Sequence, residues 1–238
     1  MSGREPISRK EKALRALLGP AVKLLGPRRL REGQRMFFKA TEVLREVLHM
    51  KNALVVYYSE TSNTEKVASA IRSGLEREGL EVTVKTIGEA TEAEFYDYDL
   101  VCFGSPVVHS LPPAPVLKFI RRCEKTYRDT NDVRVSSPPI LGKNALVFTT
   151  YSGPHCGVNE ALPAGKYVRQ FFEHLGFDVC AEWYEVGEFH GYEELSTKGR
   201  LGDIRGRPNA DDLAMVELKT IQLVKTLKPL ERDADDGA

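Results

Sequence analysis

The sequence predicts an α/β fold in which a doubly wound, five-stranded parallel sheet follows an N-terminal helical extension. From Asn52 onward, short apolar runs alternate with stretches in which apolar residues recur at helical spacing. Three of these runs lack the polar alternation of a half-exposed strand, which is typical of strands covered by helices on both faces. A repeated strand–helix–strand pattern requires right-handed crossovers, so the sheet is expected to be parallel.

The elements are expected in regular order along the chain. The predicted strands span 53–58, 81–87, 99–104, 144–150 and 177–186, and the predicted helices start near 63 and span 115–122, 160–175 and 211–227. The first, third and fourth strands are uncharged apolar runs, whereas the second alternates Val82, Val84 and Thr86 with polar residues. Two stretches rich in Pro, Gly and charge, 123–142 and 188–209, are predicted to be surface loops.

The N-terminal extension differs in charge from the rest of the chain. Residues 1–51 contain 13 Lys and Arg against 5 Asp and Glu, a net charge of +8. Because the whole chain has a formal charge of zero, residues 52–238 carry −8. Apolar residues at helical spacing predict two helices in the extension, which either pack on a protein surface or adsorb to an anionic membrane surface. Packing on protein is the interpretation that we favour.

The cysteines and the lengths of the apolar runs indicate the redox environment and the location of the protein. Four cysteines without a CxxC pair predict neither a disulfide framework nor a zinc site, and no metal ligands are assigned. No run reaches the ~18 apolar residues of a membrane span, and the N-terminus lacks the pattern of a signal peptide. We therefore expect a reduced, cytoplasmic protein. We expect no nucleic-acid partner.

The stretch after the first strand predicts an anion site. Ser59–Thr64 places Asn63 and the hydroxyls of Ser59, Thr61 and Thr64 between a buried strand and the first turn of a helix. The first amides of a helix have no intrahelical partner and carry partial positive charge, so they stabilise a phosphate. A simpler alternative is a helix cap, in which Asn63 or Thr64 accepts a hydrogen bond from the first turn. We favour the phosphate site.

Two further loops leave buried strands at the same edge of the sheet, where ligands of open α/β folds bind. Gly104–Pro112 is mostly uncharged, and its backbone groups suit the polar edges of a planar ring. Thr149–Gly157 offers Tyr151 as a stacking surface. Together the three loops predict a site for a mononucleotide that carries a large uncharged ring. Neither a G-x-G-x-x-G fingerprint nor a P-loop motif occurs.

The loops resemble those of the flavodoxin-like family of FMN-binding proteins, which includes flavodoxins and flavodoxin-type NAD(P)H:quinone reductases. The resemblance covers about residues 52–228. SETSNT at 59–64 resembles the family's phosphate loop, [ST]-x-T-G-x-T, while GSPVV at 104–108 and TYSG at 150–153 resemble its two flavin loops. The resemblance implies FMN as cofactor and the sheet order 2-1-3-4-5. It also implies that residues 52–230 form the FMN-binding domain, between the basic helical extension 1–51 and an acidic, disordered tail at 231–238.

The resemblance assigns binding residues but no catalytic side chain. The implied FMN contacts are Ser59, Thr61, Ser62, Asn63, Thr64, Ser105, Pro106, Val107, Val108, Thr150, Tyr151, Ser152 and Gly153. Ser62 departs from the family pattern because it stands where glycine is usual. If this position requires a positive φ, serine carries about 1 kcal/mol or more of strain.

Three functions stay open on the sequence. As a carrier, which we favour, the chain passes electrons between flavin and a redox partner protein. As an enzyme, it is an FMN-dependent oxidoreductase that takes hydride from NAD(P)H and reduces a quinone or similar small-molecule acceptor, typically as a homo-oligomer. As a scaffold, it has lost the cofactor through Ser62. The absence of an arginine cluster near the three loops counts against a nicotinamide-dinucleotide site, and Cys156 beside His155 is an alternative redox thiol.

Overall fold

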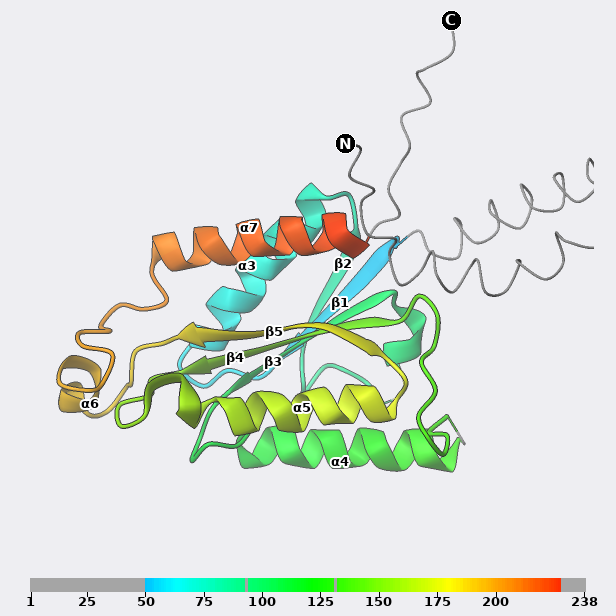
Figure 1. The fold of residues 1–238 in the computed structure, drawn as a ribbon, viewed down its shortest axis with the longest axis horizontal. Coiled ribbons are helices and arrows are strands. Elements are labelled where there is room, and N and C mark those ends of the chain that lie inside the picture. The colour runs from blue at the N-terminus through cyan, green and yellow to red at the C-terminus, as the bar shows by residue number, and fades with distance from the viewer. Residues whose placement is uncertain (1–49, 93, 131, 228–238) are drawn as a thin grey trace, which may run out of the picture. The chain divides into compact units, whose positions relative to one another are not determined.

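The computed structural model describes residues 50–92, 94–130 and 132–227 (Figure 1). The predicted helical extension, apart from its last two residues, and the predicted acidic tail lie outside these ranges. The strands are β1 (Asn52–Tyr57), β2 (Glu81–Thr86), β3 (Leu100–Pro106), β4 (Asn144–Tyr151) and β5 (Asp178–Val186). The helices are α3 (Asn63–Arg77), α4 (Ala114–Asp129), α5 (Leu162–His174), α6 (Glu193–Thr197) and α7 (Ala210–Leu227), with 3₁₀ turns η1 (Phe95–Asp97) and η2 (Gly157–Glu160).

The five strands form one parallel sheet in the order β2-β1-β3-β4-β5, which confirms the predicted fold class. Strand order reverses at β1, because the chain moves outward to β2 and then returns to the other side at β3. This reversal places the carboxyl ends of β1 and β3 side by side, where open α/β sheets bind their ligands.

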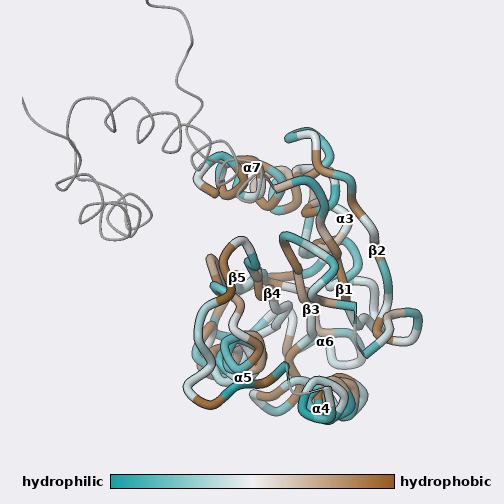
Figure 2. Tube along the Cα trace, turned by 90° about the vertical axis from the view of Figure 1, so that its right-hand side faces the viewer, coloured by the Kyte–Doolittle hydropathy of each residue, from teal (hydrophilic) through white to brown (hydrophobic). Residues whose placement is uncertain are grey.

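Helices cover both faces of the sheet. In Figures 1 and 2, α3 and α7 lie on one face, and α4 and α5 lie on the other. The first face buries aliphatic residues, among them Val67, Ile71, Leu75, Leu146, Val216 and Val224. The second contains a group of aromatic rings in contact, formed by Phe95, Phe103, Phe119, Phe171 and Phe172. Two-sided burial explains why β1, β3 and β4 read as continuous apolar runs.

One glycine shows how closely the core is packed at the edge that carries the loops. A Cβ atom on Gly104 in β3 would lie 2.2 Å from the Phe148 ring of β4. Glycine is therefore required here by packing against the neighbouring strand. The close approach at Gly104 is thus between two strands of the sheet.

The two predicted surface loops are more structured than expected. Helix α4 runs through Asp129, because Cys123 and Tyr127 continue the buried stripe that starts at Phe119. The prediction ended this helix at 122, because the charged or polar residues 124–126 obscure the apolar pattern. The second stretch, 188–209, contains α6 and buries Ile204. No helix in the part of the chain that the structure describes is long and apolar enough to cross a membrane.

Candidate cofactor site at the carboxyl edge of the sheet

The loop between β1 and α3 adopts the backbone that the family's glycine would provide. Ser62 is the N-cap residue of α3 and has φ 63° and ψ 0°, in the left-handed region. Its carbonyl accepts the first helical hydrogen bond, from the amide of Lys66 at 3.0 Å. Strain was expected at position 62 if its φ is positive. Because φ is positive, Ser62 carries this strain. The Ser62 side chain makes no capping bond, and Asn63 and Thr64 lie inside the helix, so the simple cap interpretation is wrong.

Asn63 and Thr64 are buried polar residues at the start of α3. The Thr64 hydroxyl lies 2.8 Å from the Thr150 hydroxyl, which joins the phosphate-loop helix to the end of β4. The Asn63 amide nitrogen donates to the carbonyl of Glu188 at 3.0 Å. The Asn63 Oδ1 atom, in a side chain that is 7% exposed, has no hydrogen-bond partner among the described residues. A buried acceptor without a donor is destabilising by about 1–3 kcal/mol, so this atom indicates a missing donor.

The loop after β3 is more internal than predicted. β3 continues through Pro106, so Ser105 and Pro106 lie in the strand, and the buried Ser105 hydroxyl donates to the Pro106 carbonyl at 2.8 Å. The amide of Val107 donates to the Thr150 carbonyl at 2.9 Å, and that of Val108 donates to the Leu111 carbonyl at 2.8 Å. The amides of Val107 and Val108 are therefore already engaged within the protein.

The tip of that loop is a tight turn with two strained residues. His109 and Ser110, between Val108 and Leu111, have φ 49° and 63°. Two consecutive positive φ angles are typical of a type I′ turn, which favours Asn-Gly. The backbone hydrogen bonds of this turn use the amides of Val108 and Leu111 and not those of His109 and Ser110. Val108 and Leu111 are partly exposed beside them.

The loop after β4 closes tightly on itself. Gly153 has φ 51°, its carbonyl accepts the Gly157 amide at 3.0 Å, and a Cβ on it would lie 2.6 Å from the Gly157 carbonyl oxygen. The amides of His155 and Cys156 donate to Glu160 Oε1 at 2.8 and 2.5 Å. Glycine at 153 is thus required both by backbone conformation and by space.

Tyr151 and Ser152 connect this loop to the segment after β5. Tyr151 ends β4 and is 9% exposed, and burial, followed by the charge of Glu185, raises the pKa of its phenol. Ser152 Oγ donates to the Gly187 carbonyl at 2.8 Å, and the Gly187 amide donates to the Tyr151 carbonyl at 2.8 Å. Most of the Tyr151 ring therefore contacts protein rather than solvent.

Segment 188–209, whose length alone favoured a substrate or interface role, contacts two of the three loops. Its residue Glu188 holds Asn63, and its Arg200 amide donates to the Pro154 carbonyl at 2.8 Å. It carries three arginines, of which Arg205 and Arg207 pair with acidic residues and Arg200 is exposed. The structure thus brings Arg200 beside the loop after β4, where the sequence argument expected no arginine cluster. The Asn63–Glu188 contact joins residues 125 apart in the sequence, so no local pattern could reveal it.

Known proteins share this architecture. A family model described as flavodoxin matches residues 55–199, which is more than half of the chain. The chain belongs to the flavodoxin family. An "NAD(P)H dehydrogenase (quinone)" of Archaeoglobus fulgidus is 26% identical over 198 residues, which cover 71% of this chain and 93% of that protein. One of Paracoccus denitrificans is 23% identical over 195 residues, 69% of this chain and 88% of that protein.

Solved flavodoxins have the same fold as this family member. A flavodoxin from the domain Archaea superposes with a TM-score of 0.51 at 19% identity, over 75% of this chain and 99% of that one. A flavodoxin, WrbA-like protein from Agrobacterium tumefaciens gives a TM-score of 0.50 at 18% identity, over 75% and 98%. Together with the three loops at one sheet edge, family membership identifies a flavin-type redox protein.

Proposed function

We propose that this flavodoxin-family chain is an FMN-dependent oxidoreductase that transfers electrons from NAD(P)H to a quinone or similar small acceptor. The observation that carries the cofactor assignment is that the loops after β1, β3 and β4 leave the same edge of the sheet, and that the first of them leads into the buried, unpartnered Asn63 Oδ1. The choice of reductase over carrier is supported by the two quinone dehydrogenases, which align over most of their length. Segment 188–209, which a minimal carrier does not need, also supports it.

The residues present fit FMN. In this proposal the first-turn amides of α3 and the hydroxyls of Ser59 and Thr61 hold the phosphate, because these donors are neutral and adjoin a helix N-terminus. Asn63 Oδ1 accepts from a ribityl hydroxyl, since a phosphate oxygen has no proton to donate. The bound flavin supplies the redox chemistry, and the protein sets its access and potential.

The flavin ring is placed between the loops after β3 and β4. Because the Val107 and Val108 amides are engaged, the donors proposed for the ring edge on the β3 side are the amides of His109 and Ser110. On the other side, Ser152 and Gly153 offer main chain beside the buried Tyr151. Ser62 sets the path of the phosphate loop through its left-handed backbone.

The first test is a visible absorbance spectrum of the purified protein, followed by chromatography of what heat releases. Flavin bands and released FMN are expected. Steady-state oxidation of NADPH and NADH with a soluble quinone then separates reductase from carrier, and quinone-dependent turnover is expected. A yellow protein without turnover would overturn the reductase and leave the carrier. A protein that stays colourless after incubation with FMN would leave only a scaffold without cofactor.

A carrier that acts with a protein partner is the second candidate. The net charge of −8 over residues 52–238 favours it, because complementary charge steers encounters between redox proteins. The proposal for the reductase also includes a cytoplasmic location and assembly as a homo-oligomer. Light scattering of the FMN-loaded protein measures the latter.

A further inference from the structure

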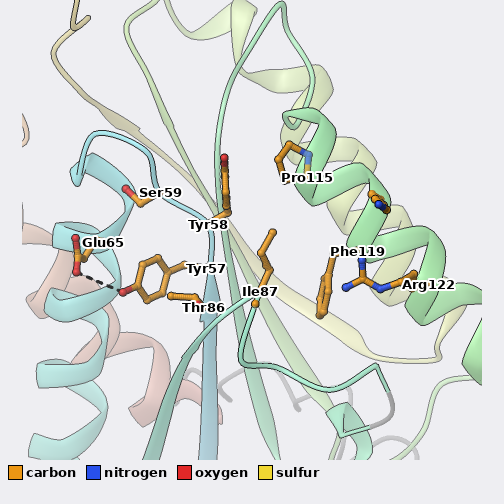
Figure 3. Close-up of a pocket in the computed structure, with 11 residues that line it drawn as sticks. Tyr57, Tyr58, Ser59, Glu65, Thr86, Ile87, Pro115, Phe119 and Arg122 are labelled. Atoms are coloured by element: carbon orange, nitrogen blue, oxygen red, sulfur yellow. Dashed lines mark hydrogen bonds between the residues drawn. The ribbon is translucent and has the colours of Figure 1, made fainter.

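A cavity of about 530 Å³ lies beside the phosphate loop, between the start of α3, the end of β2 and helix α4 (Figure 3). Of the residues assigned to FMN, only Ser59 lines it. It also lacks every residue of the loops after β3 and β4 that are placed around the flavin ring. Ligand pockets commonly enclose about 300–1,000 Å³, so this cavity is large enough for a small-molecule ligand of its own.

The middle of the cavity is apolar and aromatic. Tyr58 follows β1, Ile87 follows β2, and Pro115 and Phe119 lie on the first turns of α4. Figure 3 shows these four side chains around the same space. Phe119 is fully buried, so of the two rings only that of Tyr58, which is partly exposed, can stabilise a planar ring by stacking. The walls therefore suit a ligand with a flat ring.

The α4 side of the cavity carries two cations. Lys118 and Arg122 both line it and are one helical turn apart, and Arg122 pairs with Glu92 at 2.6 Å. Arg122 is oriented, because its guanidinium carbon lies 5.5 Å above the Phe119 ring and its Nε donates to Glu92 at 2.6 Å. Lys118 forms no ion pair with any residue that the structure describes. The helix as a whole is cationic, with Lys118, Arg121, Arg122, Lys125 and Arg128 against Glu124 and Asp129.

The α3 side of the cavity presents hydrogen-bond acceptors instead. Glu65 lies there within 3.5 Å of the Tyr57 hydroxyl, and Ser59 and Thr86 add hydroxyls. Figure 3 shows Glu65 and Ser59 across the cavity from Arg122. A matching ligand thus has donor groups at one end, a planar ring, and an anionic group at the other end.

We propose that this cavity binds a nucleoside phosphate. The phosphate lies between Lys118 and Arg122, the base packs on Tyr58, and amine or sugar hydroxyl groups donate to Glu65. The inference does not depend on the proposed reductase activity. Two sources share this chemistry, a free nucleotide and the adenosine phosphate half of a nicotinamide dinucleotide.

The test is calorimetric titration of ADP into the full chain, with and without saturating FMN. Saturable binding that FMN leaves unchanged is expected. Loss of ADP binding in FMN would show that ADP occupied the phosphate loop, and would overturn the proposal. Absence of saturable binding would overturn it as well.

A matched pair of charge variants locates the site. The double variant Lys118→Gln/Arg122→Gln is expected to weaken ADP binding at least tenfold. The control Arg121→Gln/Arg128→Gln removes the same charge from exposed positions of the same helix that do not line the cavity. It should change affinity less than twofold. Equal weakening in both would indicate unspecific attraction to a basic helix, and would count against the site.

Displacement of ADP by NADPH distinguishes the two sources, and either result supports a nucleoside phosphate site. If the dinucleotide is the ligand, NADPH displaces ADP, and Lys118→Gln/Arg122→Gln weakens both ligands by the same factor. If a free nucleotide is the ligand, ADP stays bound in excess NADPH. This measurement needs no turnover, so it is independent of whether the chain reduces quinones.

Discussion

The backbone conformation of Ser62 is expected to affect both the stability of the protein and its binding of FMN. Its φ of 63° is a conformation that glycine adopts without strain. Ser62→Gly should therefore stabilise the protein by about 1 kcal/mol and tighten FMN binding, measured by urea unfolding and by quenching of flavin fluorescence. Ser69→Gly is the matched control, because Ser69 lies exposed inside α3, where glycine should destabilise by about 0.5 kcal/mol. Destabilisation in both variants would contradict the strain at Ser62.

The hydroxyl pair of Thr64 and Thr150 makes a second prediction for single residues. Their oxygens are 2.8 Å apart and buried, so Thr64→Val leaves the Thr150 hydroxyl without a partner. A loss of about 1–3 kcal/mol is expected in the free energy of unfolding. The double variant Thr64→Val/Thr150→Val removes both polar groups at similar volume and should recover most of that loss. A double variant that loses the sum of both single losses would show that the hydroxyls do not interact.

The cysteines differ in reactivity because they differ in burial. Burial raises the pKa of Cys123 and of Cys180 to about 12 and also raises that of Cys102, whereas Cys156 is exposed. Thiolate is the reactive form, so at pH 8 a thiol reagent should modify one cysteine in the native protein and four in denaturant. Cys156→Ser should leave none reactive in the native state. Fast modification of a second thiol would contradict the packing of β3, α4 or β5.

At the scale of elements, sequence patterns predicted what depends on neighbouring residues. The apolar runs of β1, β3 and β4 are local signals, and so is the polar stretch that starts at Ser59. The ends of these strands were therefore predicted to within a few residues. The end of α4 was missed because Cys123 and Tyr127 are spaced among charged residues. The contacts of Glu188 and Arg200 with the site could not be predicted, since a fold has to exist before such distant residues meet.

Helix α7 offers a prediction for an element and its pH dependence. Asn209 Oδ1 accepts the amides of Asp211 and Asp212 at 3.0 Å, and Asp212 binds the Arg207 guanidinium and the Asn209 amide. The Arg207 hydrogen bond lowers the pKa of Asp212. A lowered folded-state pKa contributes stability that is present above the unfolded-state pKa and is lost as pH falls through the folded value.

The variant Asp212→Asn keeps an oxygen for the Asn209 amide but removes the charge. It should lose about 0.5–1 kcal/mol of unfolding free energy at pH 7, because the pair is partly exposed and screened by solvent. The difference from the native chain should shrink as pH falls below the ordinary pKa of aspartate, about 3.9, and vanish below the lowered pKa of Asp212. Urea unfolding at a series of pH values measures it. A difference that is constant with pH would assign the loss to capping geometry instead of charge.

At the scale of the molecule, the −8 charge of residues 52–238 acts on any flavin held at the sheet edge. Reduction adds negative charge to the flavin, which an acidic body opposes, so the midpoint potential of the bound cofactor should lie below that of free FMN. Salt screens exposed charges beyond about 10 Å at 0.1 M. Raising ionic strength from about 0.02 to 0.5 M should therefore raise the potential, on the order of 30 mV, or ~1.4 kcal/mol for two electrons. Free FMN titrated under the same conditions is the control. A bound potential equal to that of free FMN, or one indifferent to salt, would mean that local backbone donors rather than the acidic body set the chemistry.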